Sequence, residues 1–232
     1  MRKAWLLARR EIIEQYSDRG ARLRAIFFVA LPVGLIALNR GGGRSPDVLI
    51  FIFALQAALL PTATAINAAA GSFAAEKEAQ TLVPLLAAPI RDIDIVAGKL
   101  MGVLVPAVGL SIVSLAAYYV AASVIFGEER VAQLLVPTTL FGLFALAVFF
   151  ILTVGAWVMV VSARVGSQRT AQQIAGLVLG GMIVLLSAVG SALQNVSVEL
   201  VLGLVIAILA SDVAALEFAR RLWNREEAVA RL

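Results

Sequence analysis

The sequence predicts an all-α polytopic membrane protein with six transmembrane helices, an N-terminal amphipathic interfacial helix and a short cytoplasmic helix between spans two and three. Hydrophobic residues fill 61% of its 232 positions and charged residues only 15%, whereas soluble domains have about 45–50% apolar and about 25% charged residues. Several apolar runs exceed the roughly 18 residues that mark a transmembrane helix. Basic residues lie at the ends of these runs, which indicates membrane topology and not nucleic-acid binding.

The residue types that the sequence lacks exclude several kinds of chemistry. Cys and His do not occur, so disulfides, thiolate or imidazole catalysis and Cys or His metal ligands are excluded from this chain. No base accompanies any serine, so nucleophilic catalysis has no support. We therefore predict that the chain is not an enzyme by itself and holds no metal. The charged first segment also lacks the apolar core and cleavage site of a secretory signal peptide.

Residues 1–24 carry seven Lys or Arg residues and a partial helical face. That face consists of Trp5, Ala8, Ile12, Ile13 and Tyr16. Aromatic rings suit the headgroup depth of a bilayer, and arginines suit anionic lipid. We expect a separate interfacial helix with membrane lipid as its partner; the alternative is a cytoplasmic helix packed on another protein.

Three apolar runs follow this segment. The first span is expected at 25–38, and the second at 48–70 with a kink at Pro61, because proline removes one backbone hydrogen bond. The third run, 93–126, would measure about 51 Å as a helix at ~1.5 Å per residue, against a hydrocarbon core of ~30 Å. Its helix must therefore begin outside the hydrocarbon or bend near Pro106, and Gly127 closes it.

Three further spans complete the predicted transmembrane domain, 25–218. The fourth is expected at about 134–161, the fifth at 174–193 and the sixth at 198–218, with a polar loop at 162–173. A basic tail, 219–232, ends the chain.

Six spans place both termini and the loops at 72–99 and 162–173 on one side of the membrane. That side carries 16 of the 19 Lys and Arg residues, and the other side carries three. The positive-inside rule therefore places both termini in the cytoplasm.

The polar stretch 72–99 contains a predicted short helix. Thr81 is a good N-cap for 82–88, whose first turn tolerates Pro84, and Pro89 ends it. Acidic residues upstream favour a helix N-terminus. Its apolar side chains would be exposed in a cytoplasmic loop unless the membrane interface or a groove on a partner protein covers them. The residues concerned are Glu76, Glu78, Thr81, Leu82, Val83, Leu85, Leu86 and Pro89.

The string FAAEKEAQTLVPLLAAPIRDIDIVAGK, residues 73–99, resembles the cytoplasmic signature of the ABC type-2 exporter permease family. In that signature an acidic residue precedes Gly-Thr-Leu-Glu-x-Leu-Leu-x-Ser-Pro-Ile, and Gly-Lys follows some eight residues later. The matching residues are Glu78, Thr81, Leu82, Leu85, Leu86, Pro89, Ile90, Gly98 and Lys99, whereas Gln80, Val83 and Ala88 depart from it. The segment SARVGSQRTAQQIAGLVL, 162–179, is similar to a second stretch of such permeases.

The resemblance implies the permease subunit of an export pump in a bacterial or archaeal cytoplasmic membrane. Two six-span copies, or one copy and a related permease, would pair with ABC ATPase subunits that bind ATP and Mg. The helix within 76–89 would then dock on the ATPase. The chain lacks a phosphate-binding loop, so no cofactor is expected in it. The alternatives are a haem-exporter-type permease of cytochrome maturation and a membrane scaffold that recruits a cytoplasmic partner.

Uncharged polar and small residues within the spans are candidates for a substrate pathway or a dimer interface. In the fifth span they form a stripe about 80° wide at ~100° per residue, which suits close helix approach. In the second span three polar residues lie on or near one face. Packing within one subunit is the alternative for both groups. The candidates are Gln56, Thr64, Asn67, Gly176, Gly180, Ser187 and Ser191.

Overall fold

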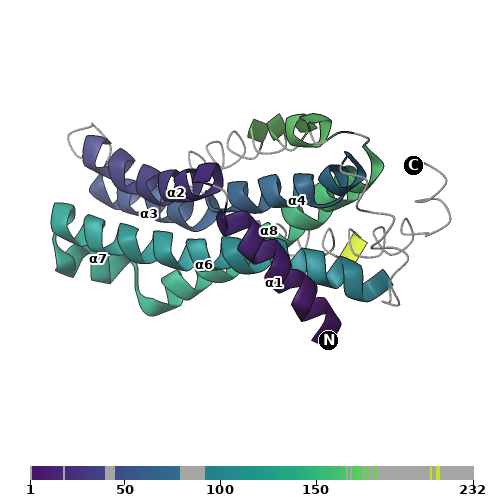
Figure 1. Cartoon of the computed structure of the whole chain (residues 1–232). Helices are drawn as coiled ribbons and strands as arrows, with labels where there is room; N and C mark the ends of the chain where they lie inside the picture. Colours follow the sequence, from purple (N-terminus) through teal and green to yellow (C-terminus); the bar gives the residue numbers. More distant parts are fainter. Residues whose placement is uncertain are drawn as a thin grey trace.

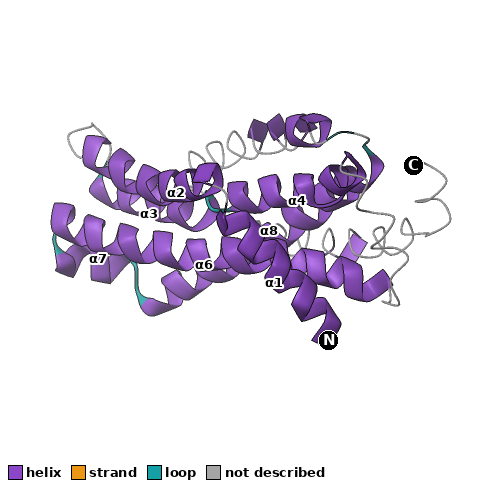
Figure 2. Ribbon diagram, in the orientation of Figure 1, coloured by secondary structure: helices purple, strands orange, loops and turns teal. Residues whose placement is uncertain are grey.

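The computed structural model describes residues 2–17, 19–39, 45–78, 92–165, 167, 169–174, 176–177, 180–181, 210 and 213–214. Every regular element in these ranges is a helix (Figures 1 and 2). The helices are α1 (Arg2–Ser17), α2 (Arg19–Asn39), α3 (Pro46–Leu59), α4 (Thr62–Glu78), α6 (Asp92–Phe126), α7 (Glu128–Leu134) and α8 (Pro137–Arg164).

Four stretches of the described chain are long and apolar enough to cross a membrane. They are Arg19–Asn39, Pro46–Ser72, Ile95–Phe126 and Pro137–Ser162. The first four predicted spans are confirmed by these stretches, and the chain is a multi-pass membrane protein. The fifth and sixth predicted spans, 174–193 and 198–218, lie largely outside the described residues, so six spans stay a prediction.

The fourth span begins later than the sequence predicts. Gly127 ends α6 with a φ of +92°, in the region that favours glycine. The residues after it form the separate short helix α7, which the sequence reading did not anticipate. Val136 then adopts an extended conformation, and Pro137 starts α8 at a position where proline fits. The prediction that the span starts at about 134 was therefore wrong by three residues.

The second span is the central element of the described bundle. About 78% of its most apolar window is buried inside the structure, compared with 17% for α2, 39% for the third span and 44% for the fourth. Its buried side chains include many alanines, which allow neighbouring helices to approach closely. Figure 1 shows α1 running obliquely across α6.

The second span breaks at Pro61, as the sequence predicts. Helix α3 ends at Leu59 and α4 begins at Thr62, because Pro61 has no N–H to continue the ladder. Short i to i+3 bonds close the break: the N–H of Ala63 donates to Leu60 O and that of Thr64 to Pro61 O, both at 3.0 Å. By contrast, α6 runs continuously from Asp92 to Phe126 through Pro106.

Side chains of α6 donate hydrogen bonds to the backbone of α3. The hydroxyl of Ser111 donates to Ala58 O at 2.9 Å, one turn before the break. Closer to α7, the hydroxyl of the fully buried Tyr118 donates to Ile50 O at 2.7 Å. The hydrocarbon core of a membrane contains no water that could replace these hydrogen bonds. The bonds therefore hold α3 against α6.

Ser111→Ala is expected to lower the free energy of unfolding by about 1 kcal/mol, because it removes a buried bond between helices. Ser123→Ala is the matched control, since the hydroxyl of Ser123 donates to Tyr119 O of its own helix and alanine favours helices. Unfolding of both variants by denaturing detergent in mixed micelles measures the difference. Equal destabilisation by the two substitutions would contradict the assignment.

Candidate functional site at the Lys99 junction

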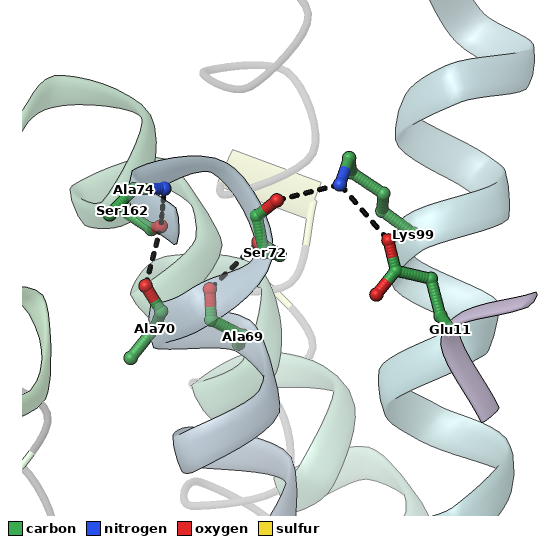
Figure 3. Close-up of polar contacts among 7 residues, drawn as sticks. All are labelled: Glu11, Ala69, Ala70, Ser72, Ala74, Lys99 and Ser162. Carbon is green, nitrogen blue, oxygen red and sulfur yellow. Dashed lines mark hydrogen bonds and ion pairs between the residues drawn. The ribbon is translucent and has the colours of Figure 1, made fainter. Parts of the chain in front are cut away.

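Four helices come together near the end of α4 and the start of α6, the two helices that flank residues 79–91 along the chain. The segment follows the last residue of α4 and precedes the first residue of α6. Side chains from α1, α6 and α8 bond to each other or to α4 at this end of the bundle (Figure 3). We call the group of Glu11, Ser72, Lys99 and Ser162 the Lys99 junction.

The Lys99 ammonium joins three helices. Its side chain is only 3% exposed. The Nζ atom of Lys99 donates to Ser72 O of α4 at 2.6 Å and to Glu11 Oε1 of α1 at 3.1 Å. Taking an ammonium out of water costs several kcal/mol unless it is paired and hydrogen-bonded. The carbonyl and the carboxylate therefore compensate the buried charge and fix its position.

Helix α1 lies very close to α6 beside this ion pair. A Cβ built on Gly102 would stand 2.7 Å from Glu11 Cβ and 3.6 Å from Ala8 O. Ala8 itself is completely buried. A side chain at position 102 would clash with α1, so glycine is required for the approach that brings Glu11 to Lys99.

Ser162 connects α8 to the same part of α4. Its hydroxyl donates to Ala70 O at 2.8 Å and accepts a bond from the N–H of Ala74 at 3.1 Å. Ala70 and Ala74 are four residues apart, the spacing of the groups that an α-helix joins directly. The Ser72 hydroxyl also donates to Ala69 O of its own helix at 2.8 Å. These contacts fix helices and suggest no bond-breaking chemistry.

The residues predicted to dock on an ATPase lie at and beyond the end of α4. The backbones of Glu76 and Glu78 form part of the last turn of α4. The other predicted residues, Thr81, Leu82, Val83, Leu85, Leu86 and Pro89, lie outside the described residues. Their role remains a prediction.

The polar residues predicted in the second span bond within their own helix. The hydroxyl of Thr64, which is buried, donates to Pro61 O at 2.7 Å, and Asn67 Nδ2 donates to Ala63 O at 2.9 Å. Gln56 is half-buried in α3. These bonds satisfy the polar groups of Thr64 and Asn67 within the helix, and both the packing role and the pathway role stay predictions.

The predicted small-residue stripe is only partly described. Gly176 and Gly180 are exposed, and a Cβ built on either residue would meet nothing within 4 Å in the described chain apart from its own local backbone. Ser187 and Ser191 lie outside the described residues. A second helix could approach the two glycines closely, so their predicted use as an interface remains open to test.

Sequence reasoning matched Lys99 to a motif without giving it a role and did not select Glu11, Ser72, Gly102 or Ser162. Two signals were present. Lys99 is a cation inside the apolar run 93–126, and such residues need a partner. Gly98 and Gly102 have the four-residue spacing typical of close helix approach. The partner Glu11 lies 88 positions away along the chain, which no local pattern indicates.

The model of a family described as ABC-2 family transporter protein matches residues 7–208. The match covers most of the 232 residues and includes all four residues of the Lys99 junction as well as 79–91. It confirms the resemblance carried by 73–99 and 162–179. Among curated proteins, none matched the chain.

Gly102→Ala is expected to push α1 away from α6, because the added methyl group would meet Glu11 Cβ, which is not the free end of a flexible side chain. Gly109→Ala, in the same helix, is the matched control, since among the described residues nothing beyond that helix lies within 4 Å of its Cβ position. Protease cleavage of α1 in detergent-solubilised protein measures the separation. Equal cleavage rates in both variants and the unsubstituted chain would contradict the prediction.

Proposed function

We propose that this chain, which belongs to the ABC-2 family of transporter proteins, is the permease subunit of an ATP-driven exporter whose ATPase is a separate polypeptide. The proposal rests above all on the family match across residues 7–208. ATP and Mg would bind the partner subunit, and this chain would supply the membrane path and the surface on which the ATPase docks.

The position of the signature within the fold supports docking of the ATPase at 76–89. Residues 79–91 join the end of the second span to the start of the third, so a force applied there acts directly on both helices. The leucines of this stretch would be exposed to water in a cytoplasmic loop, and a groove on the ATPase would bury them. Closure of the ATPase dimer would then tilt α4 and α6 and alternate access to the path.

A second permease copy, or a related permease, would complete the membrane part. Exposed Gly176 and Gly180 are the candidates for its contact surface, together with Ser187 and Ser191. Gln56, Thr64 and Asn67 are the candidates for the path along the second span. The membrane would be the cytoplasmic membrane of a bacterium or archaeon, with both termini in the cytoplasm.

The outward face of α1 supports its placement at the membrane interface. Trp5, Leu6, Ile13 and Tyr16 are between 43% and 58% exposed, and Arg9 is exposed beside them. Ala8 was predicted on the same face as Trp5, but this was wrong: it is buried and lies with Glu11 on the opposite face, against α6. Aromatic and aliphatic side chains mixed with arginine fit the boundary between headgroups and acyl chains.

Leu85→Asp is expected to abolish co-purification of a Walker-type ATPase, because an aspartate cannot enter an apolar groove without losing its hydration. Val136→Asp is the control: it adds the same charge at the exposed N-cap of α8, where aspartate is favoured. The measurement is pull-down from membranes that also contain the neighbouring cytoplasmic proteins. Retention of the ATPase by Leu85→Asp would refute docking, and a stable complex with a non-ATPase partner alone would favour the scaffold.

Single-cysteine labelling is expected to place the ends of the bundle on opposite sides of the membrane. The chain has no native Cys, so Glu128→Cys and Arg169→Cys each present one thiol at an exposed position. A membrane-impermeant maleimide should label Glu128→Cys in intact cells and Arg169→Cys only after permeabilisation. The reverse pattern would invert the proposed orientation.

A further inference from the structure

We infer that Lys99 is a positioning residue for energy coupling, which makes the ends of α1, α4 and α6 move as one unit when the segment 79–91 is displaced. The inference rests on the proposed function, because it assigns a route by which the ATPase would act on the helices. It adds α1 to the moving parts and names the side chain that connects it.

The hydrogen bond from Lys99 Nζ to Ser72 O joins the two helices that flank residues 79–91. The two residues are 27 positions apart, one on the helix that enters the segment and one on the helix that leaves it. The bond is short, at 2.6 Å, and the Lys99 side chain is only 3% exposed, so the bond is shielded from water. Displacement of the segment should therefore carry both helices together and not spread them.

The bond to Glu11 extends this unit to α1. Neither α1 nor Glu11 adjoins 79–91 along the chain, so covalent connection does not transmit a displacement to it directly. The 3.1 Å ion pair and the close approach at Gly102 provide the physical connection. A charge-assisted hydrogen bond also requires a defined distance and direction, so it fixes the position of α1 more specifically than an apolar contact would.

Helix α8 is joined to α4 independently of Lys99. Ser162 bonds Ala70 O and the Ala74 N–H, and Lys99 takes no part in either bond. Apolar side chains of α4, α6 and α8 also share one buried cluster next to the junction. Removal of the ammonium should therefore weaken the connection of α1 to α4 and α6 while α8 still follows α4, and this difference separates a coupling role from a general loss of structure.

The test places an environment-sensitive fluorophore on one introduced cysteine at a time in the chain co-purified with its ATPase. Ile13→Cys reports α1, with a side chain 57% exposed, and Arg169→Cys reports the residues that follow α8. Fluorescence is compared between the nucleotide-free complex and the complex trapped with ATP and vanadate. We expect a nucleotide-dependent change at both positions when Lys99 is present.

Lys99→Met should remove most of the nucleotide-dependent change at Ile13→Cys and leave the change at Arg169→Cys in place. Glu11→Ala should have the same effect and removes a residue that is one-third exposed, so it serves if Lys99→Met does not fold. Asp47→Ala, which removes an exposed ion pair with Arg130 outside the Lys99 junction, is the control and should keep both changes.

An undiminished change at Ile13→Cys in Lys99→Met and Glu11→Ala would overturn the inference and leave the proposed function standing. Equal loss at both label positions would overturn it as well, because it would show a general disturbance. If the chain with Lys99 shows no nucleotide-dependent change at either position, the proposed function falls, and the inference falls with it.

Discussion

The fold depends on holding a broken helix at the centre of a membrane bundle. Backbone groups in lipid need partners within the protein, and Pro61 interrupts the ladder of the most buried of the four described spans. Side chains of the helices packed on this span supply further bonds to its carbonyls. Tyr118 and Ser111 bond the part before the break, and Lys99 and Ser162 bond the part after it. One helix thus becomes the common attachment for the others.

Much of the fold follows from local chemistry that is visible in the sequence. Runs of apolar residues long enough for a bilayer gave the first four spans, and the lack of an N–H in proline gave the break at Pro61. The start of the fourth span was misplaced, since α7 is too short and too mixed in polarity to stand out, and its separation depends on the φ of Gly127 and the extended Val136. Backbone angles at such junctions depend on packing that a linear pattern does not contain.

The candidate site was less accessible from the sequence, because its members come from four helices. A lysine inside an apolar run demands a partner, but the chain offers fifteen acidic residues and the sequence does not order them in space. In addition, the group that accepts the shorter hydrogen bond from Lys99 is a backbone carbonyl, which every residue possesses. Ser72 and Ser162 likewise look like ordinary small residues until the structure shows which carbonyls lie beside Lys99 and Ser162.

The tie between Ser72 and Lys99 also bears on how tightly a partner can bind. A flexible segment loses conformational entropy when its ends are brought together, and this loss adds to the cost of ordering it on a surface. Here the two helices that flank 79–91 are already fixed relative to each other by the fold. Part of the entropy loss therefore occurs when the chain folds and not when the partner arrives, so the same apolar contacts would give a higher affinity than on an untethered peptide of that sequence.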